Sequence, residues 1–287
     1  MPAFGKRRAF GQHFLRDPGI IRIIAQTAVE EASKNDCRGL LEIGPGKGAI
    51  TYPLLELLDQ QSWKTPHIER FTLAERDIKF VNDWHDRIDA RKAETATPYE
   101  VKIQSGDFLE LADEKWLTGT PLAVVSNLPY SAGTAILTRL AGHTKDIPVM
   151  VLMFQAEVAF RLRAESGTKA WGSLSIWIQN LWDVTQLCSV PPEAFTPPPD
   201  VDSEVVVLKR RTTPRVEVPN DAESQQLWES LLKACFAHRR KMLRSGLSAH
   251  PQFIQALQKA PIDPTLRAEA LSWTQWAQFF SAVQSLR

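Results

Sequence analysis

Short apolar runs alternate with helical stretches through the middle of the chain, and this alternation limits the possible folds more than any other feature. Five of the runs have the length and composition of buried strands: residues 39–43, 71–75, 101–104, 122–126 and 149–154. Helical segments are expected between them, near residues 49–58, 78–88, 132–140 and 155–163. Strands that alternate with helices favour a parallel sheet covered by helices. The sequence therefore predicts an α/β fold.

The segments on either side complete the predicted architecture. A first helix is expected over residues 18–32, with Asp17 as its N-cap and Pro18 at the first helical position. Strands at 184–190 and 204–210 bring the sheet to seven, and these last two are expected to form an antiparallel edge pair. Two polar stretches, 59–67 and 89–99, look like loop extensions between sheet elements.

The C-terminal part of the chain has a different pattern. Residues 212–221 have the composition of a linker, and the apolar residues that follow recur at helical spacing without a clear strand. We therefore expect two domains: an α/β domain over residues 1–211 and a small all-helical domain over residues 212–287.

Composition excludes several classes of protein. A hydrophobic content of 44% with 23% charged residues is ordinary for a folded chain. The longest apolar run, Ile147–Phe154, is far shorter than the ~20 residues of a membrane-spanning helix. The N-terminal sequence has no apolar core of signal-peptide length, so we expect a cytoplasmic location and no membrane partner. The three cysteines are far apart and form no CxxC pair, so neither a disulfide framework nor a metal site is expected.

The net charge of +1 hides a separation of charge along the chain. Thirteen Lys and Arg lie in three segments that contain no acidic residue, namely 1–16, 209–215 and 233–244. Each segment alone could be a solvated surface stretch. Together they favour a polyanionic partner, because such a separation suits a protein that binds phosphates.

A glycine-rich loop, Gly44-Pro45-Gly46-Lys47-Gly48, directly follows the first strand. Glycines allow a sharp turn and let a ligand approach the backbone closely. With Ala49 the loop also fits the GxGxxG/A dinucleotide pattern. A nicotinamide-dependent enzyme is therefore an alternative interpretation of this loop. A P-loop is excluded, because Gly48 follows Lys47 where Ser or Thr is required.

Two acids follow later strands. Glu75 ends the second strand, where a carboxylate can accept hydrogen bonds from both hydroxyls of a ribose. Asp107 follows the third strand and could accept a hydrogen bond from an adenine amino group, with Phe108 beside the ring. The plainer interpretations are an acid at a strand end and a loop-capping aspartate.

The tetrapeptide Asn127-Leu128-Pro129-Tyr130 follows the fourth strand and is the decisive motif. It resembles the (D/N)-P-P-Y motif of methyltransferases that act on exocyclic amines. The lone pair of adenine N6 is delocalised into the ring. Acceptance of the N6 hydrogens by the Asn127 amide oxygen and the Leu128 carbonyl would localise that lone pair toward a sulfonium methyl group. Tyr130 offers a stacking face for an extruded base.

Two further segments narrow the family. VPPEAFTPPPDVDSEVVVL and CFAHRRKMLRSGL are absent from generic methyltransferases. With GQHFL, LEIGPGKG, NLPY and FQAEVAFRL they make residues 10–247 resemble the KsgA/RsmA-type small-subunit (16S) rRNA adenine N6-dimethyltransferases. The resemblance implies a Rossmann-like class I methyltransferase fold that uses S-adenosyl-L-methionine, with a C-terminal helical domain.

The resemblance also implies roles for single residues. The cofactor would be bordered by His13 and Leu15, Gly44 would lie against its methionine part, and Glu75, Asp107 and Asn127 would contact its ribose, its adenine and the methyl acceptor. The catalytic set would be Asn127, Leu128, Tyr130 and Phe195, where Phe195 is a second aromatic on the proline-rich loop. The expected RNA-binding residues are Arg7, Arg8, Arg239, Arg240, Lys241 and Arg244, the last four on one helix. The expected partner is small-subunit rRNA within a pre-30S or 30S particle, bound by a monomer. Ser131-Ala132-Gly133-Thr134 departs from the residues common in relatives.

Four alternatives stay open at this stage. The large-subunit rRNA adenine dimethyltransferases are the nearest, although the VDSEVVVL segment and the HRRK stretch favour the small-subunit enzymes. A DNA adenine methyltransferase would need a target-recognition domain, which nothing here resembles. A ribosome-assembly factor that acts mainly by binding is the alternative from another class, and a nicotinamide dehydrogenase is the fourth.

Overall fold

The computed structural model describes residues 13–60, 68–94 and 96–286, which fall into two compact units. The first unit comprises the described part of residues 1–159 together with 185–210, and the second comprises 160–184 and the described part of 211–287. Arg7 and Arg8 lie outside the described residues, as does most of the stretch 59–67. The segment 160–184 therefore groups with the C-terminal helices, whereas the domain boundary expected near residue 211 stays a prediction.

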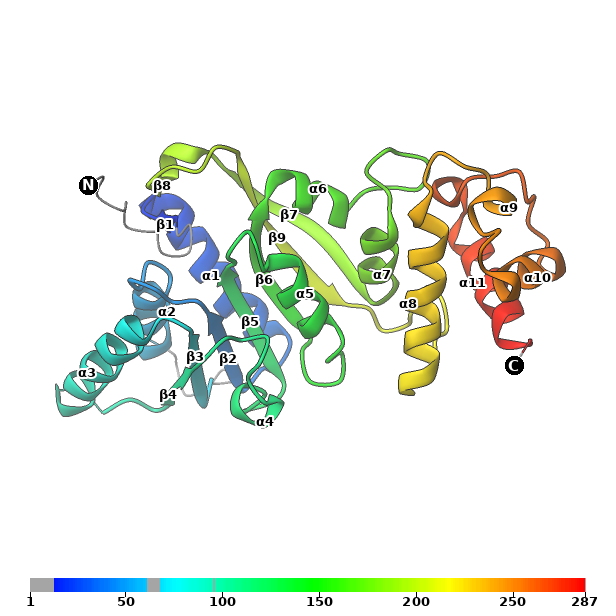
Figure 1. Ribbon diagram of the computed structural model, residues 1–287. Helices are drawn as coiled ribbons and strands as arrows, with labels where there is room; N and C mark the ends of the chain where they lie inside the picture. The colour runs from blue at the N-terminus through cyan, green and yellow to red at the C-terminus, as the bar shows by residue number, and fades with distance from the viewer. Residues whose placement is uncertain (1–12, 61–67, 95, 287) are drawn as a thin grey trace, which may run out of the picture. The chain divides into compact units, whose positions relative to one another are not determined.

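The first unit is built on a seven-stranded sheet with the order β4-β3-β2-β5-β6-β9-β7 (Figure 1). The strands are β2 (Gly39–Ile43), β3 (Arg70–Glu75), β4 (Glu100–Ser105), β5 (Leu122–Asn127), β6 (Val149–Gln155), β7 (Trp182–Val190) and β9 (Ser203–Arg210). The first five in this order are parallel, and β9 runs antiparallel to β6. The predicted seven-stranded, mostly parallel sheet is confirmed. Strand β2 lies between β3 and β5, so the strand order changes direction there, and ligands of open α/β sheets bind at such a point.

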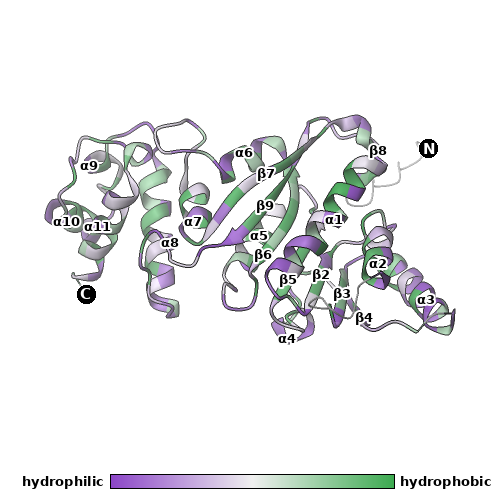
Figure 2. Cartoon of the chain, turned by 180° about the vertical axis from the view of Figure 1, so that it is seen from behind, coloured by the Kyte–Doolittle hydropathy of each residue, from purple (hydrophilic) through white to green (hydrophobic). Residues whose placement is uncertain are grey.

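Helices of the first unit pack on this sheet. They are α1 (Pro18–Lys34), α2 (Thr51–Asp59), α3 (Ile78–Glu94), α4 (Asp113–Trp116), α5 (Gly133–Ala141) and the start of α6 (Ala156–Leu162). Helix α1 contacts β5 and β6, and α3 contacts β3 and β4. The Asp17 carboxylate caps α1 by accepting from the Ile20 N–H at 2.9 Å, as predicted. Hydrophobic residues dominate the central strands, while polar residues cover the outward sides of helices such as α3 (Figure 2).

Two features of this unit differ from the sequence-based expectation. The stretch expected to be a loop from residue 89 continues helix α3 as far as Glu94, and in this extension Arg91 pairs with Asp59 and hydrogen-bonds the Tyr99 hydroxyl. A second, two-stranded sheet joins β1 (Phe14–Leu15) to β8 (Phe195–Thr196), which follows the short helix η1 (Pro192–Ala194). It fastens the GQHFL segment to the proline-rich loop, and two-residue strands are too short to show a period in the sequence.

The second unit is helical, as expected. It contains α7 (Ser173–Leu181), α8 (Ala222–Ala237), α9 (Leu243–Gly246), α10 (Pro251–Lys259), η2 (Ala268–Ala270) and α11 (Trp273–Gln284). Its core includes the buried indoles of Trp171, Trp228 and Trp276. None of the helices in the described ranges is both long enough and apolar enough to cross a membrane.

The basic run at the end of α8 is not one continuous helix, which corrects the expectation from sequence. Helix α8 ends at Ala237, and its C-cap His238 leaves the helical conformation at φ −126° and ψ 59°. The Lys241 N–H then closes a turn onto the His238 carbonyl at 2.8 Å. Arg239, Arg240 and Lys241 therefore project from a turn, and Arg244 belongs to the next helix, α9.

Candidate active site

A cavity of about 820 Å³ opens where the order of the strands changes direction, in the first unit. Its walls come from the carboxyl ends of β2, β3 and β5, the loop after β4, and the strand β1. Of the predicted site residues it brings together His13, Leu15, Gly44, Glu75, Asp107, Asn127, Leu128 and Tyr130. These eight residues come from five separate segments of the sequence and line one cavity.

The glycine loop and Glu75 form one hydrogen-bonded structure. Gly44, Gly46 and Gly48 have φ values of +70°, +50° and +93°, which residues with a side chain rarely adopt. Buried Glu75 accepts from the Gly46 N–H at 3.0 Å and from the Arg76 and Asp77 N–H groups at 2.8 Å each. Glu75 therefore holds the loop as well as lining the cavity, a second role that sequence reasoning missed.

Asp107 is fixed by two donors. Its Oδ1 accepts from the Leu109 N–H at 3.0 Å, and its Oδ2 pairs with the Arg76 guanidinium at 3.0 Å. The hydrogen bond from the Leu109 backbone, followed by the Arg76 interactions, lowers the pKa of Asp107 despite its partial burial. The carboxylate is thus held ionised, as an acceptor for an amino group requires. Arg76 also lines the cavity and was not predicted, because an arginine after a strand end carries no motif.

The NLPY segment leaves two acceptors available beside the cavity. The Asn127 Nδ2 donates to the His13 carbonyl at 3.3 Å, which orients the amide and leaves its Oδ1 without a partner among the described residues. The Leu128 carbonyl also accepts no hydrogen bond from any described residue. Two neighbouring oxygens that need donors suit a ligand with an amino group.

Tyr130 is held by contacts with two distant segments. Its hydroxyl hydrogen-bonds the buried Ser203 Oγ at 2.5 Å, and its ring stacks on the His13 imidazole with centroids 5.7 Å apart. The His13 Nδ1 in turn donates to the Pro197 carbonyl at 2.8 Å. Burial raises the pKa of Tyr130, so the phenol stays neutral. Ser203 is a positioning residue that the sequence did not identify, because 73 residues separate it from Tyr130.

Glu42 is a further acid that sequence reasoning missed. It lies in β2 directly before the glycine loop, lines the cavity and is only 2% exposed. Its Oε2 has no hydrogen-bond partner among the described residues. Burial raises the pKa of Glu42 to about 8, with a smaller contribution from the nearby Glu75. The sequence signal that could have identified Glu42 is its place as an acid within an otherwise apolar strand.

The structure does not bring every predicted residue to the cavity. Phe195 is 1% exposed and packs in the hydrophobic core, whereas the neighbouring Thr196 lines the cavity. In the β1–β8 pair it lies opposite Leu15, and both side chains belong to the same hydrophobic core. The stacking role expected of Phe195 stays a prediction that the cavity wall does not support.

The predicted RNA-binding residues of the second unit differ among themselves. The Arg239 guanidinium donates to the carbonyls of Lys169 and Trp171 at 2.6 and 2.8 Å. Within the part of the chain that is described, the charged ends of Arg240 and Lys241 have no hydrogen-bond or ion-pair partner, and both residues are exposed. Arg244 is exposed near Asp263, whose pKa it helps to lower after two larger hydrogen-bond contributions from Thr265.

Comparison with known proteins identifies one family. Residues 3–285 match the family model described as ribosomal RNA adenine dimethylase. Two similar curated proteins are both named ribosomal RNA small subunit methyltransferase A. The protein from Thiobacillus denitrificans is 39% identical, and the alignment covers 92% of each chain. The protein from Enterococcus faecalis is 34% identical over 98% of this chain and 91% of its own length.

Solved structures support the fold. A dimethyladenosine transferase from Plasmodium falciparum superimposes with a TM-score of 0.66 at 23% identity, covering 93% of this chain and 96% of its own. The 23S rRNA methyltransferase ErmE gives a TM-score of 0.64 at 23% identity, covering 94% and 99%. At this identity the two likenesses establish the methyltransferase fold alone, whereas the family rests on the sequence matches.

Proposed function

The chain belongs to the ribosomal RNA adenine dimethylase family and is an S-adenosylmethionine-dependent rRNA methyltransferase, and we propose the reaction in detail. The enzyme dimethylates the N6 amines of two adjacent adenosines near the 3′ end of small-subunit (16S) rRNA during ribosome biogenesis. Its substrate is rRNA within a pre-30S or 30S particle in the cytoplasm, and it acts as a monomer. Small-subunit specificity is supported by the names of the relatives that align over nearly the whole chain.

The cavity fits S-adenosylmethionine in its shape and in its polar groups. An added Cβ at Gly44 would meet nothing within 4 Å, so the backbone there is open to a ligand. Glu75 and Asp107 present fixed carboxylates to the cavity, which suits ribose hydroxyls and an adenine amino group. The Glu42 Oε2, which has no partner among the described residues, offers a further polar group in the same cavity. Once bound, the cofactor supplies an electrophilic methyl group on a sulfonium ion.

The observation that carries the proposed reaction is the pair of acceptors, Asn127 Oδ1 and the Leu128 carbonyl, that have no donor among the described residues. Both would accept hydrogens of the target N6 amine and draw its lone pair out of conjugation with the ring. Because these oxygens are already oriented by the protein, they need no reorganisation when charge develops on the nitrogen. No general base is required, since the proton becomes acidic only after methyl transfer.

Tyr130 would hold the target base against the acceptors. The hydroxyl bond to Ser203 fixes the ring, and a fixed aromatic face stacks a base without a sequence preference. The same ring excludes water from one side of the reacting nitrogen. We further propose that residues 1–211 carry this chemistry and that the helical residues 212–287 contribute rRNA contacts.

The test is incubation of the enzyme and labelled S-adenosylmethionine with small and large ribosomal subunits from cells that lack this modification. Nucleoside analysis of the recovered RNA should yield N6,N6-dimethyladenosine from the small subunit, and primer extension should stop at two adjacent positions near its 3′ end. Label in the large subunit alone would assign the enzyme to the other branch of rRNA adenine dimethyltransferases. The Asn127→Ala variant serves as the catalytic control.

A further inference from the structure

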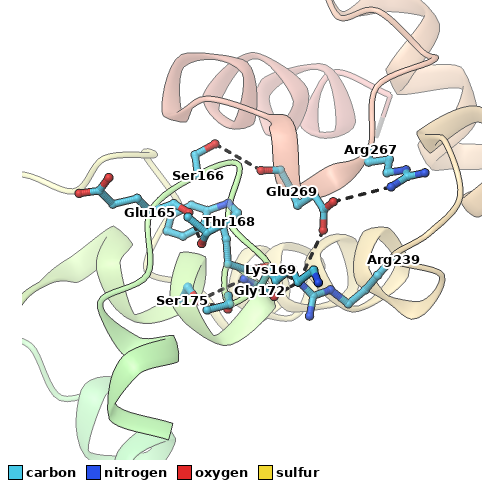
Figure 3. Close-up of polar contacts among 11 residues, drawn as sticks. Glu165, Ser166, Thr168, Lys169, Gly172, Ser175, Arg239, Arg267 and Glu269 are labelled. Carbon is cyan, nitrogen blue, oxygen red and sulfur yellow. Dashed lines mark hydrogen bonds and ion pairs between the residues drawn. The ribbon is translucent and has the colours of Figure 1, made fainter. Parts of the chain in front are cut away.

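One loop of the second unit, residues 165–172, is held at its start by the Glu269 and Leu271 carbonyls and at its end by Arg239 (Figure 3). The Gly167 N–H donates to the Glu269 carbonyl at 2.8 Å, and Gly167 has a φ of +87°. The Ser166 hydroxyl bonds the same carbonyl at 3.3 Å and the Leu271 carbonyl at 3.1 Å. Because several hydrogen bonds attach this loop to backbone carbonyls, the loop has a defined conformation in the unbound protein.

Arg239 connects this loop to the basic turn after α8. Its Nη2 donates to the Lys169 and Trp171 carbonyls, and the same nitrogen lies 3.6 Å from the Glu269 carboxylate. Glu269 also pairs with Arg267 at 4.0 Å (Figure 3). Trp171 anchors the end of the loop, because its side chain is 1% exposed and packs edge-on against Trp273 at 5.5 Å.

The contacts of Arg239 separate it from its neighbours in the sequence. Its Nη2 donates to the protein, whereas Arg240 and Lys241 project from the same turn without partners among the described residues. Lys169 is exposed, its ammonium has no partner in the described ranges, and its own carbonyl accepts from Arg239. The loop therefore brings an additional free cation to the basic turn, from 70 residues upstream.

We propose that Lys169 on this loop, together with Arg240, Lys241 and Arg244, forms a docking surface for rRNA phosphates. Arg239 is the positioning residue of that surface, because it donates hydrogen bonds to the Lys169 and Trp171 carbonyls of the loop. The long arginine side chain suits this role, since its terminal Nη2 alone reaches both carbonyls and the Glu269 carboxylate. The proposal rests on the small-subunit rRNA substrate proposed above.

Binding of the full-length protein to unmethylated small subunits across a salt series tests the surface. Each phosphate contact that is lost should make the slope of log affinity against log salt shallower by about 0.7–0.9. Lys169→Ala should produce one such change and weaken binding about three-fold, as for a single exposed ionic contact. Lys259→Ala removes one exposed charge from α10 of the same unit and should leave the slope unchanged.

A double-mutant cycle separates positioning by Arg239 from direct phosphate binding. If Arg239 acts through the loop, Lys169→Ala should add little to Arg239→Ala, because the part of the loop that carries Lys169 has already lost its attachment. Arg239→Lys keeps the charge, but its ammonium ends one bond short of the Nη2 atom that makes these contacts, so it should bind as weakly as Arg239→Ala. Additive effects, or wild-type affinity in Arg239→Lys, would show that Arg239 binds phosphate directly and would overturn the positioning role.

A readout without RNA keeps the proposal testable if binding is weak. Trypsin cleaves after Lys169, so wild-type protein should resist cleavage there, whereas Arg239→Ala and Arg239→Lys should be cut while their affinity for S-adenosylmethionine stays normal. Equal resistance of all three proteins would overturn the positioning role. The nucleoside analysis described above is independent of these results. If the enzyme methylates small subunits but Lys169→Ala changes neither the affinity nor the salt slope, the docking surface alone is refuted. If Lys169 contributes to salt-dependent binding but no methylation is found, the proposed function alone is refuted.

Discussion

The buried acid Glu42 predicts a pH dependence of stability whose magnitude follows from its position. The side chain is 2% exposed, and burial raises its pKa to about 8 from an ordinary value of 4.5. The folded protein therefore binds one proton more than the unfolded chain between these two pH values. Each pH unit in this window should cost about 1.4 kcal/mol of unfolding free energy, and the loss is complete once the pH exceeds the folded-state pKa.

Urea denaturation of the wild type and of Glu42→Gln at pH 6 and pH 8 measures this effect. Glutamine has nearly the same shape and cannot ionise, so the variant lacks the cost. Between the two pH values the wild type should lose about 2 kcal/mol more than Glu42→Gln, since the slope flattens as the acid begins to ionise near pH 8. The quantity compared is the change in unfolding free energy between pH 6 and pH 8. Any cost of burying the glutamine amide is the same at both pH values and therefore cancels.

Glu114→Gln, an exposed acid on α4, is the matched control and should follow the wild type. Parallel pH profiles for the wild type and Glu42→Gln would refute the reasoning, because they would mean that Glu42 is already ionised in the folded protein at pH 6.

Three further predictions concern the cavity. Asn127→Ala should cut single-turnover methyl transfer about 100-fold or more while the thermal midpoint hardly moves, because one preorganised acceptor is lost; unchanged turnover would exclude this role. Glu75→Ala should weaken S-adenosylmethionine binding by roughly 2–3 kcal/mol in calorimetry, since it removes charge-assisted hydrogen bonds and leaves the Gly46 N–H without its acceptor; wild-type affinity would place the ribose elsewhere. Ser203→Ala should raise KM for small subunits with normal cofactor affinity, and combination with Tyr130→Phe should cause no further loss, because both remove the same hydrogen bond.

Most of the sheet and of the cofactor side of the cavity could be predicted, because both depend on local patterns. Apolar runs marked each of the seven strands to within two residues at either end. Glu75 and Asn127 end β3 and β5, and Asp107 follows β4, so parallel pairing alone brings them to one edge. Adjacent strand ends in a parallel sheet require no further information to converge.

The remainder depends on contacts between distant segments. The β1–β8 pair joins positions about 180 residues apart through two residues on each side, which leaves no periodic signal. That pair also buries Phe195, so an aromatic on a proline-rich loop was no guide to where its ring would lie. Arg239 could not be distinguished from Arg240 by charge, because its partners lie about 70 residues upstream.

The contacts of His13 couple the cofactor side of the cavity to the side that would hold the target base. Its carbonyl accepts from the Asn127 amide, its ring stacks on Tyr130, and its Nδ1 donates to the Pro197 carbonyl. The orientation of the Asn127 acceptor and the placement of the Tyr130 ring therefore depend on one residue of the GQHFL segment. That segment is in turn fastened by β1 to the proline-rich loop. A ligand that displaces β1 would disturb the acceptor and the stacking face together, so assembly of the catalytic geometry requires this segment to be in place.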